Sequence, residues 1–247
     1  MVENGFLMSH YSNRIVVTGG SGRFGRVLQK TKSNFKIYFP NKKELDILNL
    51  AKIKKYLLSK KPKYLIHLAG LSRPMNDHYK FINKSIELNI IGTANIVRAC
   101  SDLKIKIIYF STSYVYPGIK GNYSEQDPIL PKNNYAWSKL GGECAVQMSE
   151  NFLILIVCMT EKPFVHKEAF YDFITNFIFH DEVAKITFKV LKKKGVLNIG
   201  GPTNSVYNFA KKFNPRIKKI SAKKILGKNY PLNPSMNIKK LNQILND

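Results

Sequence analysis

RIVVTGGSGRFGRVLQ, residues 14–29, passes from a β-branched apolar run into a glycine-rich turn and then into a helix-forming segment. Gly19 and Gly20 allow a tight turn off the strand, and Gly22 lets a phosphate approach bare backbone. Gly25 lets the following helix pack closely on the sheet, and that helix offers its free N–H groups to a pyrophosphate. A glycine-rich turn without a ligand is the alternative. Because strand, turn and helix occur in the required order, the stretch predicts a dinucleotide site.

The chain of 247 residues is long enough for one α/β domain, with or without a small appendage. It has no apolar run of the roughly 18 residues that span a bilayer, so no membrane partner is expected. Residues 1–13 lack the pattern of a secretory signal and are expected to form a short, frayed leader. Cys100, Cys144 and Cys158 have no metal-like spacing and are expected to be small buried hydrophobes in a reducing cytoplasm.

The formal net charge of +24 raises the question of nucleic-acid binding. Only six of the 40 basic residues are arginines, and the lysines are scattered as pairs such as Lys42-Lys43 and Lys211-Lys212 rather than gathered in one tract with aromatic residues. This pattern favours solvated lysines on many elements over a nucleic-acid partner. The positive field would still attract anionic small molecules such as nucleotide sugars.

Apolar strands and amphipathic helices alternate along the chain, which predicts a Rossmann-type, doubly wound parallel sheet. The expected strands are 15–17, 35–39, 64–70, 106–110, 151–158 and 196–199. The expected helices after the glycine loop are 50–60, 81–101, 135–150, 180–194, 205–213 and 238–245. We therefore expect a dinucleotide-binding domain over residues 1–160. A small C-terminal substrate-binding lobe is expected over 161–247, with parts of 181–200 returning to the Rossmann core.

The turn after the second strand bears on the choice of cofactor. An acidic residue there would bind the ribose 2′-hydroxyl of NAD and repel a 2′-phosphate. The turn here contains Lys42 and Lys43 with no acid before Glu44, and Arg23 lies in the glycine loop. These features favour NADP(H), with NAD(H) possible, although the two lysines also fit the general lysine excess.

A second constellation joins Tyr135 and Lys139, which are four residues apart on one helical face. A neighbouring ammonium favours the phenolate form, so Tyr135 could exchange a proton with a carbonyl oxygen while hydride moves to or from its carbon. Thr112, at the end of the fourth strand, can donate a hydrogen bond to the same oxygen. His67, in the third strand, is expected to be a packed histidine without a chemical role.

With these residues the chain resembles an extended short-chain dehydrogenase/reductase, and most closely the dTDP-4-dehydrorhamnose reductase-like nucleotide-sugar 4-ketoreductases. The resemblance rests on the glycine loop 18–25, on 44–47, 67–70, 89–93, 111–116 and 125–128, on Tyr135 with Lys139, on 139–143 and on 234–238.

The resemblance implies a role for each matching residue. Thr112, Tyr135 and Lys139 would be the catalytic set, with Lys139 also holding the nicotinamide ribose and Asn89 a structural helix residue nearby. The cofactor-binding residues would be Gly19, Gly22, Arg23, Phe24, Gly25, Lys42, Asp46, Ile47, Leu68, Ala69, Gly70, Tyr135 and Lys139. The substrate-binding residues would be Ser72, Arg73, Ser113 and Tyr114.

The resemblance also implies a possible homodimer formed through two helices of each subunit. Gly141, Gly142 and Ala145 would permit close helix packing there, although small residues that face their own sheet explain them equally well. The sequence has no cluster of carboxylates that demands a metal.

Two departures affect the expected activity, which is NADPH-dependent reduction of a nucleotide-activated 4-keto-6-deoxy sugar in polysaccharide precursor synthesis. Ser113 stands where these reductases usually carry an acid, and the segment between Cys158 and His180 is short and lacks their arginine-led motif. A nucleotide-sugar epimerase or dehydratase with tightly bound NAD is one alternative, and Ser113 and Tyr114 argue against dehydration. A non-catalytic dinucleotide-binding sensor is another, but such relatives commonly lose the tyrosine or lysine.

Overall fold

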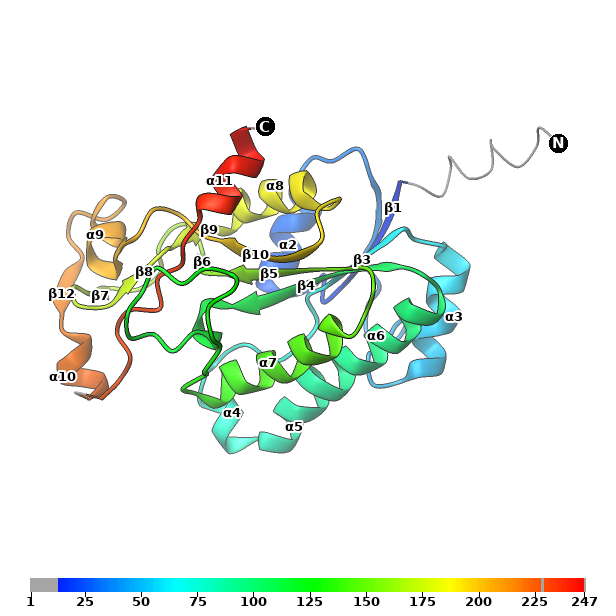
Figure 1. Cartoon of the computed structure of the whole chain (residues 1–247), viewed down its shortest axis with the longest axis horizontal. Coiled ribbons are helices and arrows are strands. Elements are labelled where there is room, and N and C mark those ends of the chain that lie inside the picture. Colours follow the sequence, from blue (N-terminus) through cyan, green and yellow to red (C-terminus); the bar gives the residue numbers. More distant parts are fainter. Residues whose placement is uncertain (1–12, 228, 247) are drawn as a thin grey trace.

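A six-stranded parallel sheet forms the centre of the computed structural model, which describes residues 13–227 and 229–246 (Figure 1). The expected leader, apart from its last residue, lies outside the described residues. The strands are β1 (Arg14–Thr18), β2 (Lys36–Tyr38), β3 (Tyr64–His67), β4 (Lys106–Thr112), β5 (Phe152–Val157) and β10 (Gly195–Ile199). They lie in the order β2-β1-β3-β4-β5-β10. The predicted Rossmann-type α/β fold is confirmed.

The order of this sheet determines where a ligand can bind. From β1 the chain moves to β2 on one side and then crosses to β3 on the other. Parallel sheets bind ligands outside the carboxyl ends of the strands, at the point where the order reverses. Here that point lies between β1 and β3, where the glycine loop begins.

Helices cover both faces of the sheet (Figure 1). One face carries α3 (Leu50–Lys60), α5 (Ile82–Ile86), α6 (Gly92–Asp102) and α7 (Asn134–Gln147). The other carries α2 (Arg23–Lys30), α8 (His180–Val190) and α11 (Lys239–Asn246). Every residue of β4 is buried, as expected for a strand between two apolar layers.

A smaller group of elements lies at one end of the sheet (Figure 1). It pairs short strands two by two, β6 (Met159–Thr160) with β9 (Ile178–Phe179), β7 (Glu168–Phe170) with β12 (Lys218–Ile220), and β8 (Ile174–Thr175) with β11 (Asn204–Ser205). Two short helices, α9 (Val206–Lys211) and α10 (Ala222–Leu226), complete it. Its separate apolar cluster contains Phe164, Phe173 and Ala210.

The long helix predicted over residues 81–101 is interrupted. Helix α4 (Asp77–Lys80) precedes it, and a π-helical segment, η1 (Glu87–Ile91), separates α5 from α6. Asn89 is buried at the centre of η1 and bonds outside the helix, which gives the irregular turn a physical reason. Such π segments are often found at functional sites.

Two other expectations need correction. A Cβ on Gly25 would lie 2.5 Å from the carbonyl oxygen of Gly20, so this glycine makes room for the loop rather than for the sheet. For Gly142, the alternative of close packing within the subunit applies, because a Cβ there would meet Asn89 and Tyr109. Cys144 is exposed, whereas Cys100 and Cys158 are buried as predicted.

Candidate active site

The glycine loop is shaped to receive an anion at the start of α2. Gly19 has φ +73°, and a Cβ on it would lie 2.5 Å from the backbone nitrogen of Ala69. The glycine loop is therefore in close contact with the segment that follows β3. Gly22 caps α2, and among the described residues no side chain bonds to that cap and no acid lies in the first turn. The N–H groups of the first turn therefore remain available for a pyrophosphate.

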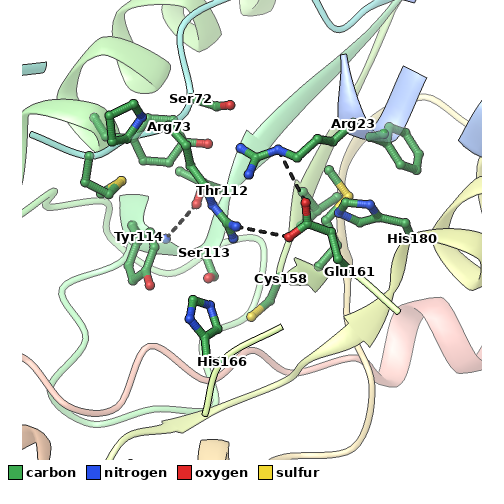
Figure 2. Close-up of a pocket in the computed structure, with 16 residues that line it drawn as sticks. Arg23, Ser72, Arg73, Thr112, Ser113, Tyr114, Cys158, Glu161, His166 and His180 are labelled. Atoms are coloured by element: carbon green, nitrogen blue, oxygen red, sulfur yellow. Dashed lines mark hydrogen bonds and ion pairs between the residues drawn. The ribbon is translucent and has the colours of Figure 1, made fainter. Parts of the chain in front are cut away.

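A pocket of about 470 Å³ lies beside this loop at the carboxyl ends of the strands. Arg23 and Phe24 reach it from the start of α2, and Ser72 and Arg73 from the loop that follows β3. Thr112 ends β4, and Tyr135 comes from the first turn of α7. The pocket is also lined by Ser113 and Tyr114 of the 3₁₀ turn η2 (Ser113–Val115) (Figure 2).

Tyr135 and Thr112 meet in this pocket. Asn133 caps α7 by accepting a hydrogen bond from the backbone nitrogen of Ala136 at 2.8 Å, which fixes the helix start next to Tyr135. Burial raises the pKa of Tyr135, while a hydrogen bond with Thr112 and the positive charges of Arg73 and Arg23 act in the opposite direction. Lys139 was expected to supply this positive charge, and in the structure Arg73 and Arg23 supply it.

Lys139 lies one helical turn further along α7, with its Nζ 4.0 Å from the centre of the Tyr109 ring. The hydroxyl of Tyr109 donates to the backbone carbonyl of Lys139 at 2.9 Å. Burial lowers the pKa of Lys139 to about 7, and the carboxyl of Glu143 opposes that shift. The ammonium therefore titrates near neutral pH, and it lies behind Tyr135 rather than in the lining of the pocket.

Two arginines converge on one carboxylate at the mouth of the pocket. Glu161 lies 3.5 Å from Nε of Arg23 and 3.3 Å from Nη1 of Arg73, through different oxygens (Figure 2). The bridge joins the glycine loop to the loop after β3. Arg23 thus points into this pocket, whose lining includes no residue of the turn after β2.

Asn89 fixes the loop that carries Ser72 and Arg73. Its Oδ1 accepts from the backbone nitrogen of Leu71 at 2.7 Å, and its Nδ2 donates to the carbonyl of Leu71 at 2.9 Å. The same Nδ2 donates to Ser138 of α7 at 2.8 Å. One buried amide therefore holds the loop after β3 against the helix that carries Tyr135.

The other predicted cofactor residues lie in two segments, one directly after β3 and one between β2 and α3. Leu68 and Ala69 touch Gly19, and a Cβ on Gly70 would lie 2.7 Å from Oδ1 of Asn89. Ile47 is buried, and its carbonyl accepts from Asn95 of α6. Asp46 bonds the backbone nitrogen of Leu48. The roles of Asp46 and Ile47 beside the adenine, and of Leu68, Ala69 and Gly70 along the path of the cofactor, stay predictions.

The turn after β2 differs from the sequence expectation in one respect. Lys42 is exposed, but the carboxylate of Glu44 folds back and accepts from the backbone nitrogen of Asn41 at 2.9 Å. An acid therefore does lie in this turn.

His67 is the packed strand histidine that was predicted. Its two ring nitrogens lie 2.7 Å from the hydroxyl of Thr18 and 3.1 Å from that of Thr93, and burial lowers its pKa to about 3. It is neutral at physiological pH.

Sequence reasoning missed several residues of the pocket. Glu161, His166 and His180 line it, and they come from the segment where family motifs gave no guidance. His78 was also missed; its ring lies 5.1 Å from that of Tyr135. No sequence pattern marks these residues, because only the folding of distant segments against one another brings them to the pocket. Within 13–227 and 229–246 no group of His, Cys, Asp or Glu could hold a metal ion.

The doubly wound sheet, with its glycine loop before α2 and the Thr112–Tyr135 pocket at the switch point, defines an α/β protein of the Rossmann type. Residues 13–175 match the family described as "RmlD substrate binding domain", and the chain belongs to that family. No helix in the described part of the chain is long and apolar enough to cross a membrane.

Three known proteins illustrate the similarity. GDP-6-deoxy-D-talose 4-dehydrogenase of Aggregatibacter actinomycetemcomitans is 33% identical over 136 residues, 51% of this chain and 45% of that protein. Methionine adenosyltransferase 2 subunit beta of Rattus norvegicus is 27% identical over 144 residues, 55% of this chain and 43% of that protein. The chain thus matches less than half the length of either.

The third is a solved structure, dTDP-4-dehydrorhamnose reductase from Bacillus anthracis in complex with NADP. It has a TM-score of 0.83 at 21% identity, covering 94% of this chain and 92% of that chain. At this identity the comparison shows a shared fold.

Proposed function

We propose that the protein reduces the 4-keto group of a nucleotide-activated 6-deoxy sugar with NADPH. The observation that carries this proposal is the meeting of Tyr135 and Thr112 in one pocket at the switch point of the sheet. The name of the Aggregatibacter relative, a GDP-6-deoxy-sugar 4-dehydrogenase, supports the substrate class. The NADP in the reductase from Bacillus anthracis supports the cofactor, and NAD(H) is the alternative.

The chemistry follows from the positions of the side chains. Gly22 and the backbone N–H groups of the first turn of α2 would hold the pyrophosphate of NADPH, which would supply the hydride. Thr112 donates a hydrogen bond to the keto oxygen and polarises the carbonyl. Tyr135 gives that oxygen a proton, and Arg23 and Arg73 stabilise the phenolate that remains. Lys139, below its pKa of about 7, presents an ammonium to the nicotinamide ribose.

A second cavity supports a nucleotide sugar as the substrate. It has a volume of about 920 Å³ and adjoins the first pocket, with which it shares the lining residues Arg73, Met75, Tyr114 and His166. Aromatic side chains that can stack on a base line it together with cations that can face a diphosphate. These residues are Tyr79, Phe164, Phe170, Phe173, Tyr230, Lys132 and Lys167. We propose that the smaller lobe closes over the nucleotide here.

A direct test is to mix the purified protein with NADPH and a panel of nucleotide 4-keto-6-deoxy sugars and to follow the absorbance of the reduced cofactor. Loss of absorbance that requires both protein and sugar supports the proposal. Turnover of nucleotide sugars without net NADPH loss would instead indicate an epimerase with tightly bound NAD.

The similarity to methionine adenosyltransferase 2 subunit beta favours a second candidate, a dinucleotide-binding subunit without its own turnover. Both Tyr135 and Lys139 are retained, with Tyr135 in the lining of the pocket and Lys139 behind it, which argues for the reductase. NADPH binding without consumption on any member of the panel would favour the subunit.

We also propose a homodimer through the outer face of α5, η1 and α7. Large apolar side chains gather on these neighbouring elements, although such residues normally avoid solvent. They are Ile82, Ile86, Ile91 and Trp137, each at least 40% exposed. Light scattering of the wild type and of Trp137→Lys tests this, because the charge should convert a dimer to a monomer.

A further inference from the structure

Glu143 is a buried acid for which the reductase mechanism has no use. It lies on α7, four residues after Lys139 and eight after Tyr135, and its side chain has no solvent exposure. Residues four apart on a helix are neighbours on one face, so Tyr135, Lys139 and Glu143 form a row that faces β4. A fully buried carboxyl is rare unless other groups satisfy it.

The carboxyl is held from two sides. The hydroxyl of Ser111 donates to Oε2 at 2.6 Å, and Nε2 of Gln147 lies 3.4 Å from Oε1. Ser111 immediately precedes Thr112 on β4, so the acid is tied to the strand that carries the catalytic hydroxyl. Burial raises the pKa of Glu143, whereas Ser111, Lys139 and Gln147 favour its ionised form.

The titratable groups around the Lys139–Glu143 pair come from α7, β3, β4 and the loop after β4. Tyr109 lies under Lys139, and burial raises the pKa of both Tyr109 and Tyr116, with a smaller contribution from the charge of Glu143. His67 faces Lys139, and burial keeps it neutral with a pKa of about 3. In the described part of the chain, no ion pair joins Lys139 to a carboxylate at contact distance. Glu143, one helical turn away, is the negative charge that opposes the lowering of the Lys139 pKa by burial.

We propose that Glu143 is a positioning residue whose buried carboxyl group, anchored by Ser111, favours the charged form of Lys139 and holds this side chain in place behind Tyr135. The inference rests on the proposed function, in which the Lys139 ammonium holds the nicotinamide ribose. Without the carboxylate, burial would lower the pKa of Lys139 further, so a smaller fraction of the side chains would be charged near neutral pH, and both the ribose contact and its alignment with Tyr135 would weaken.

The test measures the titration of Lys139 without cofactor or substrate. Trace acetic anhydride acetylates only neutral amines, and mass spectrometry of the Lys139 peptide from pH 5.5 to 10 gives the midpoint. We expect Glu143→Gln to lower that midpoint by about one pH unit, because an opposite charge has been removed. Glu143→Asp, which keeps the charge, should restore most of the shift.

Glu150→Gln is the matched control, because it removes the same charge from an exposed site just beyond α7 and should leave the midpoint unchanged. Should Glu143→Gln fail to fold by circular dichroism, Ser111→Ala provides the test. Loss of its hydrogen bond favours the neutral acid, so the Lys139 midpoint should fall by about half a unit. Midpoints equal to the wild type in the folded variants would overturn the proposal. Lack of reductase activity would count against the proposed function alone.

Discussion

Replacement of Asn89 by alanine should loosen the catalytic region measurably. The substitution removes three hydrogen bonds of 2.7, 2.9 and 2.8 Å that join η1 to Leu71 and Ser138. A net contribution of about 1 kcal/mol for each bond gives a loss of about 3 kcal/mol, reduced to about 2 kcal/mol if water reaches the partly exposed Leu71 backbone. The loop with Ser72 and Arg73 would also lose its tether.

The measurement is urea unfolding followed by circular dichroism, with the fall in midpoint converted through the slope. Asn89→Asp keeps the acceptor for the Leu71 nitrogen but loses both donated bonds, so it should lie between alanine and wild type. Asn83→Ala, an exposed change on α5, is the control and should stay within about 0.5 kcal/mol. A loss below 1 kcal/mol for Asn89→Ala would refute the view that this amide holds the site together.

Three other outcomes are expected. Lys42→Glu should shift the preference from NADPH towards NADH by at least about tenfold in kcat/KM, because the new acid repels a 2′-phosphate; unchanged selectivity would remove Lys42 from the cofactor site. Gly25→Ala should weaken NADPH binding at least about 100-fold in a fluorescence titration, because a Cβ 2.5 Å from a loop carbonyl forces the glycine loop to move. Tight binding by this variant would show that the loop is not the site. NADPH affinity should be highest below pH 7 and decline as the pH rises through the Lys139 pKa of about 7, because the ammonium loses its proton. A flat affinity profile from pH 6 to 8.5 would contradict a charged role for this lysine.

The main features of the fold could be predicted because periodicity reports burial directly. Continuous apolar runs such as 152–157 became strands covered on both faces, and the glycine loop fixed where the first crossover begins. The π-helical break at 87–91 could not be predicted. It depends on Asn89 bonding to Leu71, a contact between segments 18 residues apart that leaves the apolar stripe unchanged.

The positions of two site residues could be predicted, but the charges around them could not. Thr112 and Tyr135 were placed together because strand ends and a helix start meet at one edge of a parallel sheet. The electrostatics could not be predicted, because no sequence pattern marks the pairing of Arg23 with Glu161. The part of Arg23 in selecting the 2′-phosphate stays a prediction. Glu161, His166 and His180 belong to a segment of short strands, where position depends on the packing of the smaller lobe rather than on any repeat in the sequence.

The account depends most on Tyr135 as the proton donor, and Tyr135→Phe tests this directly because the ring and its contact with His78 remain. With a nucleotide 4-keto sugar as substrate, kcat for NADPH oxidation should fall about 10²- to 10⁴-fold while NADPH affinity stays within about twofold. A variant that oxidises NADPH at more than a tenth of the wild-type rate would contradict the central claim.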